Sequence, residues 1–547
     1  MNADQFYNEI NKENFYLGII SQVYRNRSLI QVENLSLFKE RKIKREKLIP
    51  NTINFYVVIE DIQGLFIGEV YQSKVQDNDV VNREISSGRV ENVFPEMAID
   101  IIGYLNGNDT FMLPGFKMVG VNDKVYVANE NITEKYLESL ETNIYYYPDT
   151  NCPQSKIKGF ASIVNNENAE FSIQPNSLMN RHLLVVGATN SGKSTSALSI
   201  LDELFKTDRK ILIIDPTGEY SESFPENTVT KLNLGKNTFL PVGRISMRQW
   251  EMLFQTNDNT QGSVLSSAIK SLRYQSKEGK NCVYKKKGKK VQEVERDISG
   301  VTDADSSFDL MLLAEQINEE SVEIGSKNPN MGKYVFDSFR ANTNAWLVQK
   351  VRHEFSYSSL TDFFSNPPDE SYALMDELDK FCGSKNESLY IDASNIGTTD
   401  GIGAMIIDLI SNYLIGKEKE KINPFVMFID EVHRYTHFTN ESIAVISGIT
   451  NIAREGRKKG IFLFLTTQSP VDVPKIVFSQ IGTLLIHRLT SQDDLYTVFN
   501  YLDEKSQKRI SKLNQGEAIL TSINLLQDLQ LKFNKSSRKH DNVTPVI

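Results

Sequence analysis

One eight-residue loop constrains the fold of this chain more than any other feature. Residues 187–194 fit the phosphate-binding pattern G-x-x-x-x-G-K-[ST] without a mismatch. The apolar run 183–186 before the loop is typical of a buried parallel strand, and residues 195–205 carry apolar side chains at helical spacing. The loop is therefore expected between a strand and a helix N-terminus, where backbone N–H groups and the positive helix end hold a polyphosphate.

The residues of this loop predict ATP and Mg²⁺ as ligands. Lys193 is expected to reach the β- and γ-phosphates, and the hydroxyl of Ser194 to ligate Mg²⁺. The expected nucleotide-binding residues are Gly187, Ala188, Thr189, Asn190, Ser191, Gly192, Lys193, Ser194 and Thr195.

A second strand ends in two carboxylates. Residues 425–429 are apolar and are followed by Asp430 and Glu431, which is the Walker B pattern. A buried strand carries acidic groups at its carboxyl end, where ligands bind in open α/β sheets. We expect Asp430 to accept from Mg²⁺-bound water or to bind the ion indirectly, and Glu431 to orient and polarise the attacking water. The expected enzyme is an ATPase.

Four further polar residues are candidates for the hydrolysis step. Gln468 follows the apolar run 461–465 and is expected to sense the γ-phosphate or hold the water. Arg454 and Arg457 are three residues apart, so they share a helix face, and which of them acts on the nucleotide stays open. Arg181 comes just before the first strand, at the edge of the domain, where it would reach a neighbour's nucleotide.

The pattern along the chain predicts an α/β protein with a RecA-like P-loop core and a small N-terminal β-barrel. Alternating strands and helices imply a mostly parallel sheet. The expected parts are an N-terminal barrel in 1–175, a core in 176–243 and 351–522, a helical insertion in 244–350, and a C-terminal tail in 523–547.

Two basic segments lie within these parts. The segment 39–47 is interpreted as a solvated loop rather than a nucleic-acid contact, and 285–290 as a mobile basic loop of the insertion. The expected barrel strands are 15–20, 55–59, 65–70, 111–113 and 125–128.

Composition and charge narrow the class of protein. The 547 residues are 40% hydrophobic and 24% charged, as in ordinary soluble proteins. A net charge of −9 argues against a protein that coats nucleic acid with its whole surface, but it permits a local basic channel. Since no apolar run reaches the ~18 residues of a membrane helix and no signal pattern precedes the chain's first apolar run, we expect a cytoplasmic protein.

The three cysteines indicate no metal site and no disulfide framework. Cys152, Cys282 and Cys382 lie far apart in the sequence. We expect reduced and mostly buried thiols.

Taken together, these motifs resemble the HerA branch of the HerA/FtsK ATPases. The resemblance covers nearly the whole chain, and its more specific parts are Asp-Pro-Thr-Gly-Glu-Tyr at 215–220 and Arg-Glu-Gly-Arg at 454–457. The remaining matching segments are 187–194, 429–434, 467–468 and 516–519.

The resemblance implies a fold, an assembly and residue roles. Family members have an N-terminal HAS-barrel, a RecA-like core with a helical insertion, and a C-terminal extension that braces the neighbouring subunit. They form a homo-hexamer that moves double-stranded DNA through its pore using ATP. Arg181 falls where the family places a trans-acting arginine, and Arg454 and Arg457 where it places a nearby cis-acting one. Asp215 and Glu219 are expected behind the residues that touch the nucleotide.

The resemblance also implies a partner protein. HerA-like proteins commonly work with a NurA-type nuclease, and in bacterial anti-phage defence with sirtuin-type NAD hydrolases or other nuclease effectors. This chain carries no nuclease constellation, so cutting is expected from a partner docked on the barrel. The leading hypothesis is a DNA translocase or helicase; the alternative is a defence scaffold whose nucleotide state gates effector subunits. A conjugation-type coupling ATPase is disfavoured, because no membrane segment is found.

Pore contacts are the least defined part of the sequence. The segments 394–401 and 434–440 follow expected strands and are candidates to face the DNA. A motor needs only backbone-tracking groups there, because it should not distinguish sequences. No specific DNA contact is assigned.

Overall fold

The computed structural model describes most of the chain as two compact units. They are here called the barrel unit (1–156, 162–177 and 520–532) and the sheet unit (157–161, 178–519 and 533–547). The described residues are 3–7, 10–24, 27–43, 46–48, 50, 52–105, 107, 110–164, 169–225, 229–256, 260–302, 305–365, 371–396, 399–436 and 447–539.

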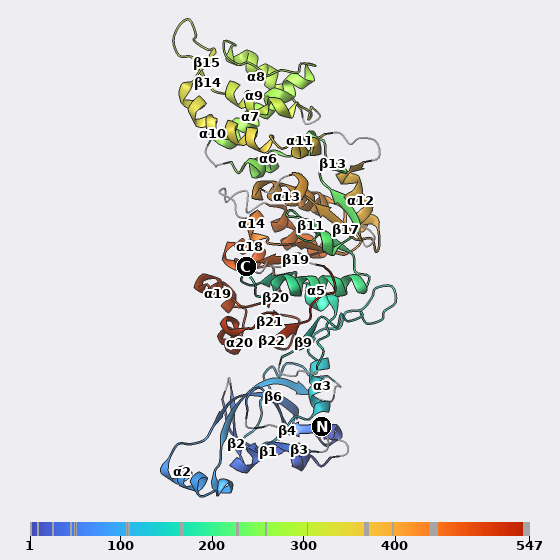
Figure 1. Cartoon of the computed structure of the whole chain (residues 1–547), viewed down its shortest axis with the longest axis vertical. Helices are drawn as coiled ribbons and strands as arrows, with labels where there is room; N and C mark the ends of the chain where they lie inside the picture. The colour runs from blue at the N-terminus through green and yellow to red at the C-terminus, as the bar shows by residue number, and fades with distance from the viewer. Residues whose placement is uncertain are drawn as a thin grey trace, which may run out of the picture. The chain divides into compact units, whose positions relative to one another are not determined.

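In its described part, the barrel unit forms a closed antiparallel barrel of six strands in the order β1-β2-β7-β6-β5-β8 (Figure 1). Closure leaves no strand edge unpaired, and the inner face is apolar, as where fully buried Ile20 lies opposite Ile30. The strands are β1 (Tyr16–Val23), β2 (Ser28–Val32), β5 (Tyr56–Asp61), β6 (Gly64–Lys74), β7 (Glu96–Leu105) and β8 (Lys124–Val127).

The expected barrel is confirmed, but its strands differ in part from the sequence prediction. Strands β2 and β7 were not anticipated, and segment 111–113 contributes only a single bridge, Tyr104 to Met112. Phe111 is buried but Met112 and Leu113 are both exposed, so the segment lacks the in-and-out alternation of a barrel strand. The unit also contains α1 (Asp4–Tyr7), α2 (Asp79–Ser86), α3 (Glu130–Glu138) and a hairpin of β3 (Arg41–Ile43) and β4 (Glu46–Leu48), which covers most of the basic segment 39–47.

The described sheet unit contains seven parallel strands in the order β12-β17-β11-β18-β19-β10-β20. Strands β10 and β18 are fully apolar and β11 is apolar up to Asp215 at its end, as expected of strands covered on both faces. Their bounds are β10 (Leu183–Val186), β11 (Ile211–Asp215), β12 (Thr230–Asn233), β17 (Leu389–Asp392), β18 (Phe425–Ile429), β19 (Ile461–Thr467) and β20 (Thr483–Ile486). The predicted α/β core is confirmed.

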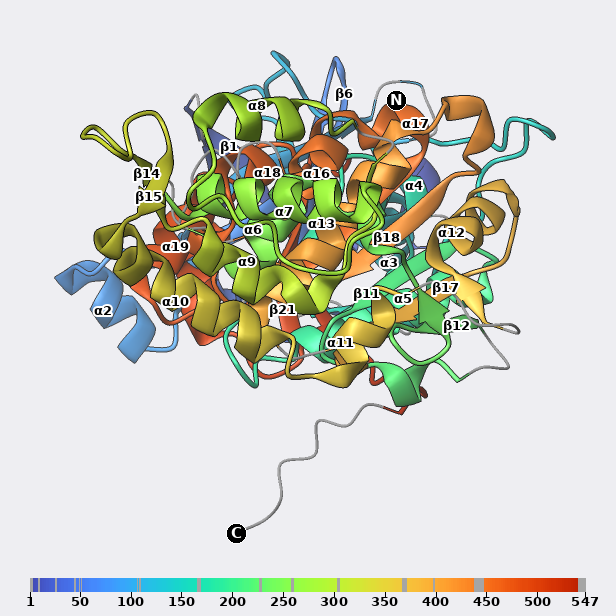
Figure 2. The ribbon, with the colours of Figure 1, turned by 90° about the horizontal axis from the view of Figure 1, so that it is seen from above.

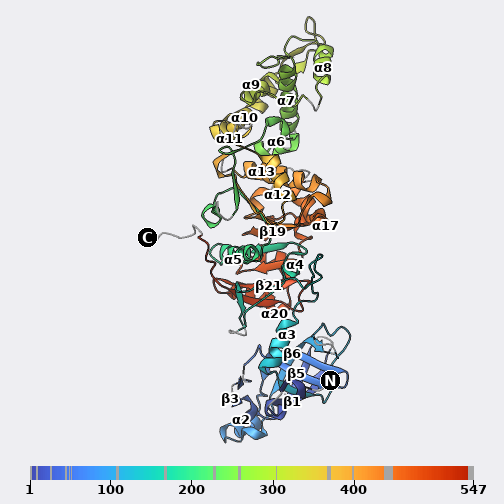
Figure 3. The same ribbon diagram turned by 90° about the vertical axis from the view of Figure 1, so that its right-hand side faces the viewer.

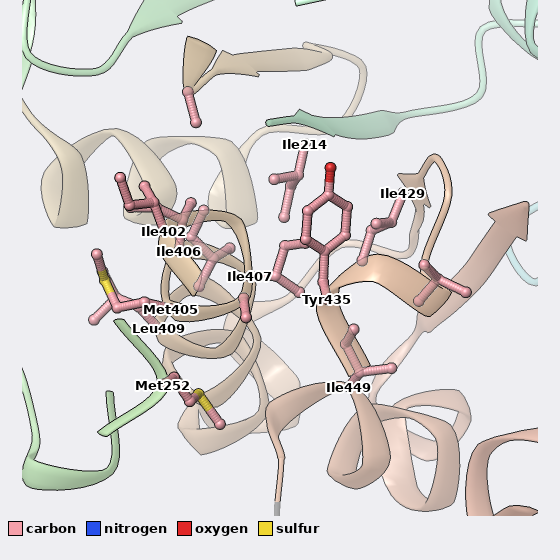
Figure 4. Close-up of a cluster of buried hydrophobic side chains, with 14 of the residues drawn as sticks. Ile214, Met252, Ile402, Met405, Ile406, Ile407, Leu409, Ile429, Tyr435 and Ile449 are labelled. Atoms are coloured by element: carbon pink, nitrogen blue, oxygen red, sulfur yellow. The ribbon is translucent and has the colours of Figure 1, made fainter. Parts of the chain in front are cut away.

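Helix α13 (Asp400–Gly416) is mainly apolar, and most of its residues are buried. A helix that is largely apolar needs cover on most of its circumference. Figure 4 shows Ile406 and Ile407 between Ile214 of β11 on one side and Met252 of α6 (Met247–Phe254) on the other. Helix α13 therefore fills the space between the sheet and the helical insertion.

The insertion is a group of helices beyond α6 (Figures 1 and 3). It contains α7 (Gln261–Lys277), α8 (Val291–Ser299), α9 (Leu313–Glu319) and α10 (Ser338–Glu354), with a small hairpin of β14 (Val322–Ile324) and β15 (Tyr334–Phe336). Figure 2 shows α7, α9 and α10 side by side.

The basic segment 285–290 differs from its prediction as a mobile loop. The side chain of Lys286 is buried and forms an ion pair with Glu320 at the end of α9. Lys289 lies over the ring of Tyr284, and the backbone of Gly288 donates to Tyr334. The ion pair with Glu320 offsets the cost of removing the Lys286 charge from water.

Short helices and strands complete the sheet unit, and some of them lie where the chain passes from one unit to the other. The boundary between the units runs through α4 (Pro175–Met179), β9 (Ala161–Ile163), β21 (Glu517–Ser522) and β22 (Leu529–Phe533). The other elements are α5 (Lys193–Lys206), β13 (Thr238–Phe239), α11 (Ser358–Phe363), β16 (Tyr372–Ala373), α12 (Leu374–Gly383), α14 (His433–Thr436), α16 (Gly448–Asn451), a π-helical turn (Ile452–Gly456), α17 (Arg457–Lys459), α18 (Lys475–Phe478), α19 (Gln492–Phe499) and α20 (Glu504–Arg509).

The described end of the tail packs on its own chain. Arg538 donates to Asp202 of α5 at 2.8 Å and lies 4.8 Å from the rings of Phe205 and Phe224. Residues 540–547 lie outside the described residues, so the bracing of a neighbouring subunit by the tail stays a prediction.

The cysteines and the search for membrane helices bear on two further expectations. Cys152 and Cys282 are exposed and Cys382 is buried, so the expectation of mostly buried thiols is wrong. Both exposed cysteines lie outside helices and strands. Among the described residues, no helix is both long and apolar enough to cross a membrane.

A buried carboxylate ties the insertion to the core. Asp408 of α13 accepts from Arg248 at 2.9 Å, Gln249 at 3.2 Å, Asn412 at 2.7 Å and the backbone of Gly448 at 2.6 Å. These partners belong to α6, α13 and α16, so one side chain joins three helices.

Replacing this carboxylate should destabilise the sheet unit. Asp408→Ala leaves Arg248 without its buried partner, and the expected loss is about 3–5 kcal/mol in the free energy of unfolding. Urea unfolding followed by circular dichroism measures it. The control Glu418→Ala removes an exposed carboxylate and should leave the free energy of unfolding unchanged. Equal stability of the two variants would contradict the assigned role.

Candidate active site

The carboxyl ends of four neighbouring strands bring the predicted site residues together. Strand β10 runs into the phosphate loop, β11 into Asp215, β18 into Asp430 and Glu431, and β19 into Gln468. Because the strands are parallel and adjacent, these residues share one edge of the sheet.

The phosphate loop has the backbone that its glycines require. Gly192 has φ 105° and caps the N-terminus of α5, and Asn190 has φ 62°. A Cβ on Gly187 would lie 2.7 Å from Cβ of His487, and one on Gly192 would lie 2.7 Å from the backbone N of Gly516. The loop is therefore packed against its surroundings and presents its N–H groups at a helix N-terminus, as an anion site needs.

Lys193 lies between the two carboxylates at the end of β18. Its ammonium group forms an ion pair and hydrogen bond with Oε1 of Glu431, and it lies 3.9 Å from Oδ1 of Asp430. All three side chains are buried or nearly so. Two negative charges and one positive charge thus meet at the sheet edge, within reach of the phosphate loop.

Glu431 is fixed by several contacts in a strained conformation. Its φ of 48° is unusual for a glutamate, and its backbone N–H donates to Oγ1 of Thr466 at 2.9 Å. Gln468 donates to its carboxylate from the backbone at 3.1 Å and from Nε2 at 2.6 Å. Nδ1 of His433 lies 3.3 Å from Oε2, and Thr189 of the phosphate loop donates to Gln468 at 2.7 Å. The carboxylate is therefore held in one orientation.

The environment moves the pKa values of the two carboxylates in opposite directions. Burial raises the pKa of Asp430, although Lys193 opposes the shift. Burial acts on Glu431 in the same sense, but Lys193 and the hydrogen bonds from Lys193 and Gln468 leave its pKa below the usual value. A carboxylate that stays ionised suits the orientation and polarisation of a water.

Asp215 and Glu219 lie beside this group, in different roles. The carboxylate of Asp215 accepts from the backbone N–H groups of Gly218 at 2.7 Å and Tyr220 at 2.9 Å, both in its own loop. It also accepts from the hydroxyl of Tyr390 in the neighbouring strand β17 at 2.6 Å. Asp215 thus shapes the loop 215–220. Burial, followed by the charges of Asp430 and Asp215, raises the pKa of Glu219.

The donor set fits a nucleotide with Mg²⁺ better than a metal held by protein alone. No group of three or more His, Cys, Asp or Glu side chains converges to hold a metal ion in the part of the chain that the structure describes. Mg²⁺ in such sites keeps waters and phosphate oxygens and needs only one or two protein ligands. A hydroxyl at Ser194 and a carboxylate at Asp430 meet that need.

The three candidate arginines do not join this group. Arg181 precedes β10, and Arg454 and Arg457 precede β19, so all three lie toward the amino ends of the strands, at the opposite edge of the sheet. Their side chains are exposed.

The two candidate pore segments approach each other where they are described. Arg434 donates to Asp400 at 3.0 Å from Nε, and its Nη2 lies 2.7 Å from the same oxygen. Residues 397–398 and 437–440 of these segments lie outside the described residues.

Three residues of the site were not identified from the sequence. Thr466 donates to Asp430 and accepts from the backbone of Glu431. His487 is fully buried, 2.7 Å from Ser196 of α5 and 2.9 Å from the carbonyl of Glu517. Gln515 donates to Asn190 of the phosphate loop at 2.7 Å. The position of Thr466 and His487 at strand ends was the available signal.

Two protein-family models match the segments of the chain that contain these site residues. The model of the central domain of helicase HerA matches residues 160–340, and that of the HerA-like C-terminal domain matches residues 415–521. Together they cover more than half of the chain.

Individual relatives are distant. The chain is 20% identical over 492 residues to the probable DNA double-strand break repair helicase HerA of Methanocaldococcus jannaschii, covering 87% of this chain and 92% of that protein. It is 22% identical over 371 residues to the DNA double-strand break repair helicase HerA of Sulfolobus acidocaldarius, covering 64% of each. The chain thus spans less than two thirds of the second relative.

Solved structures show weaker similarity. The conjugative coupling protein TrwBΔN70 superposes with a TM-score of 0.45 at 14% identity, covering 68% of this chain and 88% of TrwB. VirB4 of Thermoanaerobacter pseudethanolicus gives 0.45 at 13% identity, covering 70% and 97%.

Two buried histidines predict that acid destabilises the sheet unit. Burial lowers the pKa of His487 and of His182 to about 4 in each case, and nearby Lys193 and Arg457 act in the same sense. An unfolded histidine titrates near pH 6.5, so between about pH 6.5 and 4 the unfolded chain binds more protons and stability falls as pH falls. The expected loss at pH 5.5 is on the order of 1 kcal/mol for each histidine.

Urea unfolding at pH 7.5 and pH 5.5 measures this loss. His487→Gln should reduce the difference between the two pH values, while the control His353→Asn, at an exposed position, should leave it unchanged. A pH difference equal in all three proteins would contradict the assignment.

Proposed function

The chain belongs to the HerA helicase family of P-loop ATPases, and we propose that it hydrolyses ATP as a homo-hexameric ring that moves double-stranded DNA through its channel. Support comes from the family match of both core segments and from the residues at the carboxyl edge of the sheet. We further propose that the protein acts in the cytoplasm together with an effector protein.

One observation carries the ATPase proposal. Lys193, Asp430, Glu431 and Gln468 meet at the end of three adjacent strands, with Thr189 of the phosphate loop joined to them through Gln468. A cation for the phosphates, a carboxylate for Mg²⁺, and an ionised carboxylate held by an amide are the groups that phosphoryl transfer to water needs.

The residues would divide the work as follows. The backbone N–H groups of 188–192 bind the phosphates, and Lys193 neutralises charge on the β- and γ-phosphates. Mg²⁺, held by Ser194 and through water by Asp430, supplies charge neutralisation at the phosphate oxygens. Glu431 orients the attacking water, and Gln468 couples that carboxylate to Thr189, so that the loop and the water site move together.

The position of the three candidate arginines, away from the phosphate loop of their own chain, supports a ring of several chains. Arg181, Arg454 and Arg457 are exposed and lie toward the amino ends of the strands, opposite the phosphate loop of their own chain. An arginine at the γ-phosphate speeds hydrolysis by ~10³–10⁵-fold, whether supplied by the same chain or by another. In a head-to-tail ring these arginines would face the phosphate loop of the next subunit, so we propose trans action for Arg454 and Arg457 as well, in place of the cis action that the resemblance implies.

Charge supports DNA binding confined to a channel. With a net charge of −9, the outer surface repels nucleic acid, so binding would depend on local basic groups and fall steeply with salt. The Arg434–Asp400 pair joins the two segments proposed to line the channel.

The barrel offers a surface for the effector. Loop residues Met112, Leu113, Phe116, Met118 and Val121 are all exposed, and the side chain of Phe116 is fully so. Five apolar side chains within ten residues are unusual for a monomer surface and are typical of a protein interface. A NurA-type nuclease, or a sirtuin-type or other nuclease effector of anti-phage defence, would dock here. If DNA does not affect turnover, the alternative of a scaffold that gates its effector is favoured.

The proposed function makes a prediction about ATP turnover. ATPase activity of the purified protein should rise with linear double-stranded DNA, and Lys193→Ala or Glu431→Gln should lower kcat at least ~100-fold, because each removes charge placement in the transition state. Phosphate release measures it. The control Lys421→Ala, at an exposed surface pair, should retain activity. Turnover that ignores DNA in an assembled hexamer would contradict the translocase proposal.

The proposed ring makes a further prediction about mixed assemblies of two variants. Arg181→Ala should form hexamers, as judged by analytical ultracentrifugation, and bind nucleotide, yet lose ATPase activity. Rings assembled from Arg181→Ala and Lys193→Ala subunits should recover part of the activity, because some intact phosphate loops then face an intact Arg181. If mixed rings form and stay inactive, trans action of Arg181 is wrong.

A further inference from the structure

His182 is a buried residue that joins two arginine-bearing segments. Its Nδ1 accepts from the backbone N–H of Leu463 in β19 at 2.9 Å, and its Nε2 is 3.1 Å from the carbonyl oxygen of Ala453 in the π-helical turn. Its side chain is 2% exposed. One imidazole therefore links the residue after Arg181 to the turn that carries Arg454.

These two contacts define the state of the imidazole. A backbone N–H only donates and a carbonyl only accepts, so Nδ1 must be the acceptor and Nε2 must carry the hydrogen. That is the neutral form, in agreement with the pKa of about 4 that burial imposes. A protonated ring would lose the contact with Leu463.

The backbone of His182 is also unusual. Its φ of 62° lies in the left-handed region, which is strained for a residue other than glycine. Such a conformation persists where surrounding contacts determine it, and it turns the chain sharply between Arg181 and β10.

Arg181 is positioned by a second contact. Its carbonyl oxygen accepts from the backbone of Gly482 at 2.7 Å, and a Cβ on Gly482 would lie 2.5 Å from Cβ of Arg181. The base of the side chain thus rests on Gly482, while the guanidinium is exposed.

The facing segment is a π-helical turn, Ile452–Gly456, followed directly by α17 with Arg457. Such turns are rare and frequently occur at functional sites. Arg454 and Arg457 are exposed, and the charge of Arg457 is felt at His182. The three guanidinium groups therefore extend from two segments that share one buried hydrogen-bonding residue.

We propose that His182 is a positioning residue that holds Arg181 and the Arg454/Arg457 turn as one unit, and that this unit acts on the nucleotide of a neighbouring copy of the chain. The inference rests on the proposed ring. It makes the two arginine segments interdependent, since each is registered to the other through the two nitrogens of the imidazole. A displacement of about 1 Å at such groups costs ~100-fold in rate.

Two substitutions separate the two hydrogen bonds. In His182→Asn, the amide oxygen replaces Nδ1 as acceptor for Leu463 and asparagine tolerates the positive φ, but the link to Ala453 is lost. In His182→Gln, the longer amide reaches toward Ala453 but not Leu463. The matched control is His353→Asn, an exposed histidine of the insertion.

The expected signature of His182→Asn is kinetic. Its melting temperature and its affinity for a fluorescent ATP analogue should stay near wild type, while kcat of the ring falls at least ~10-fold with KM changed less than ~2-fold. The double variant Arg181→Ala/His182→Asn should lose little more than Arg181→Ala alone, because residues that act as a unit are not additive. Gly482→Ala, which displaces the base of Arg181 without touching His182, should show the same kinetic pattern.

Mixed rings test where His182 acts. Rings of His182→Asn and Lys193→Ala subunits should exceed the activity of either alone, because intact phosphate loops then meet intact arginine edges. Wild-type kcat for both His182 variants, a loss additive with Arg181→Ala, or co-assembled rings without recovery would each overturn the proposal. If mixed rings of Arg181→Ala and Lys193→Ala subunits also recover no ATPase activity, the proposed ring mechanism itself is wrong. If those rings recover activity but rings of His182→Asn and Lys193→Ala subunits do not, only the role of His182 is rejected.

Discussion

The structure depends on one ion group, the ammonium of Lys193 set between Asp430 and Glu431 at the end of a buried strand. Charges at this depth persist only when they are paired and hydrogen-bonded. The requirement explains the surroundings: Thr466 serves Asp430, Gln468 serves Glu431, and the strands that supply them must be adjacent and parallel. The face of the same sheet is apolar, and the mainly apolar helix α13 packs there.

The two edges of the sheet carry opposite halves of one chemistry. Carboxylates, lysine and amide gather at the carboxyl edge, and exposed arginines at the amino edge. Within one chain the halves are separated by the length of the strands. In the proposed ring, a head-to-tail arrangement of copies would bring them together and would make subunit contact a condition of turnover. On that proposal, an isolated chain would bind nucleotide and release it largely unchanged.

Much of this architecture is predictable from local pattern, and the rest is not for a physical reason. The phosphate loop, strand 425–429 and the parallel core follow from spacing within a few residues, and the structure confirms that fold class. The roles of Thr466, His487 and His182 depend on contacts with residues 36, 291 and 281 positions away. The segment 285–290 was misjudged for the same reason, because Glu320 is remote in sequence. The roles assigned to the site residues stay predictions.

The packing of Arg538 on α5 has a consequence for how the chain is made. The partner of Arg538, Asp202, lies 336 residues earlier, in the helix that begins at the phosphate loop. On the ribosome that helix is synthesised long before the side chain that completes its surface. Contacts over such separations form late. The outer face of α5 therefore reaches its final packing only after residue 538 has been made, although the phosphate loop at the start of the same helix is made much earlier.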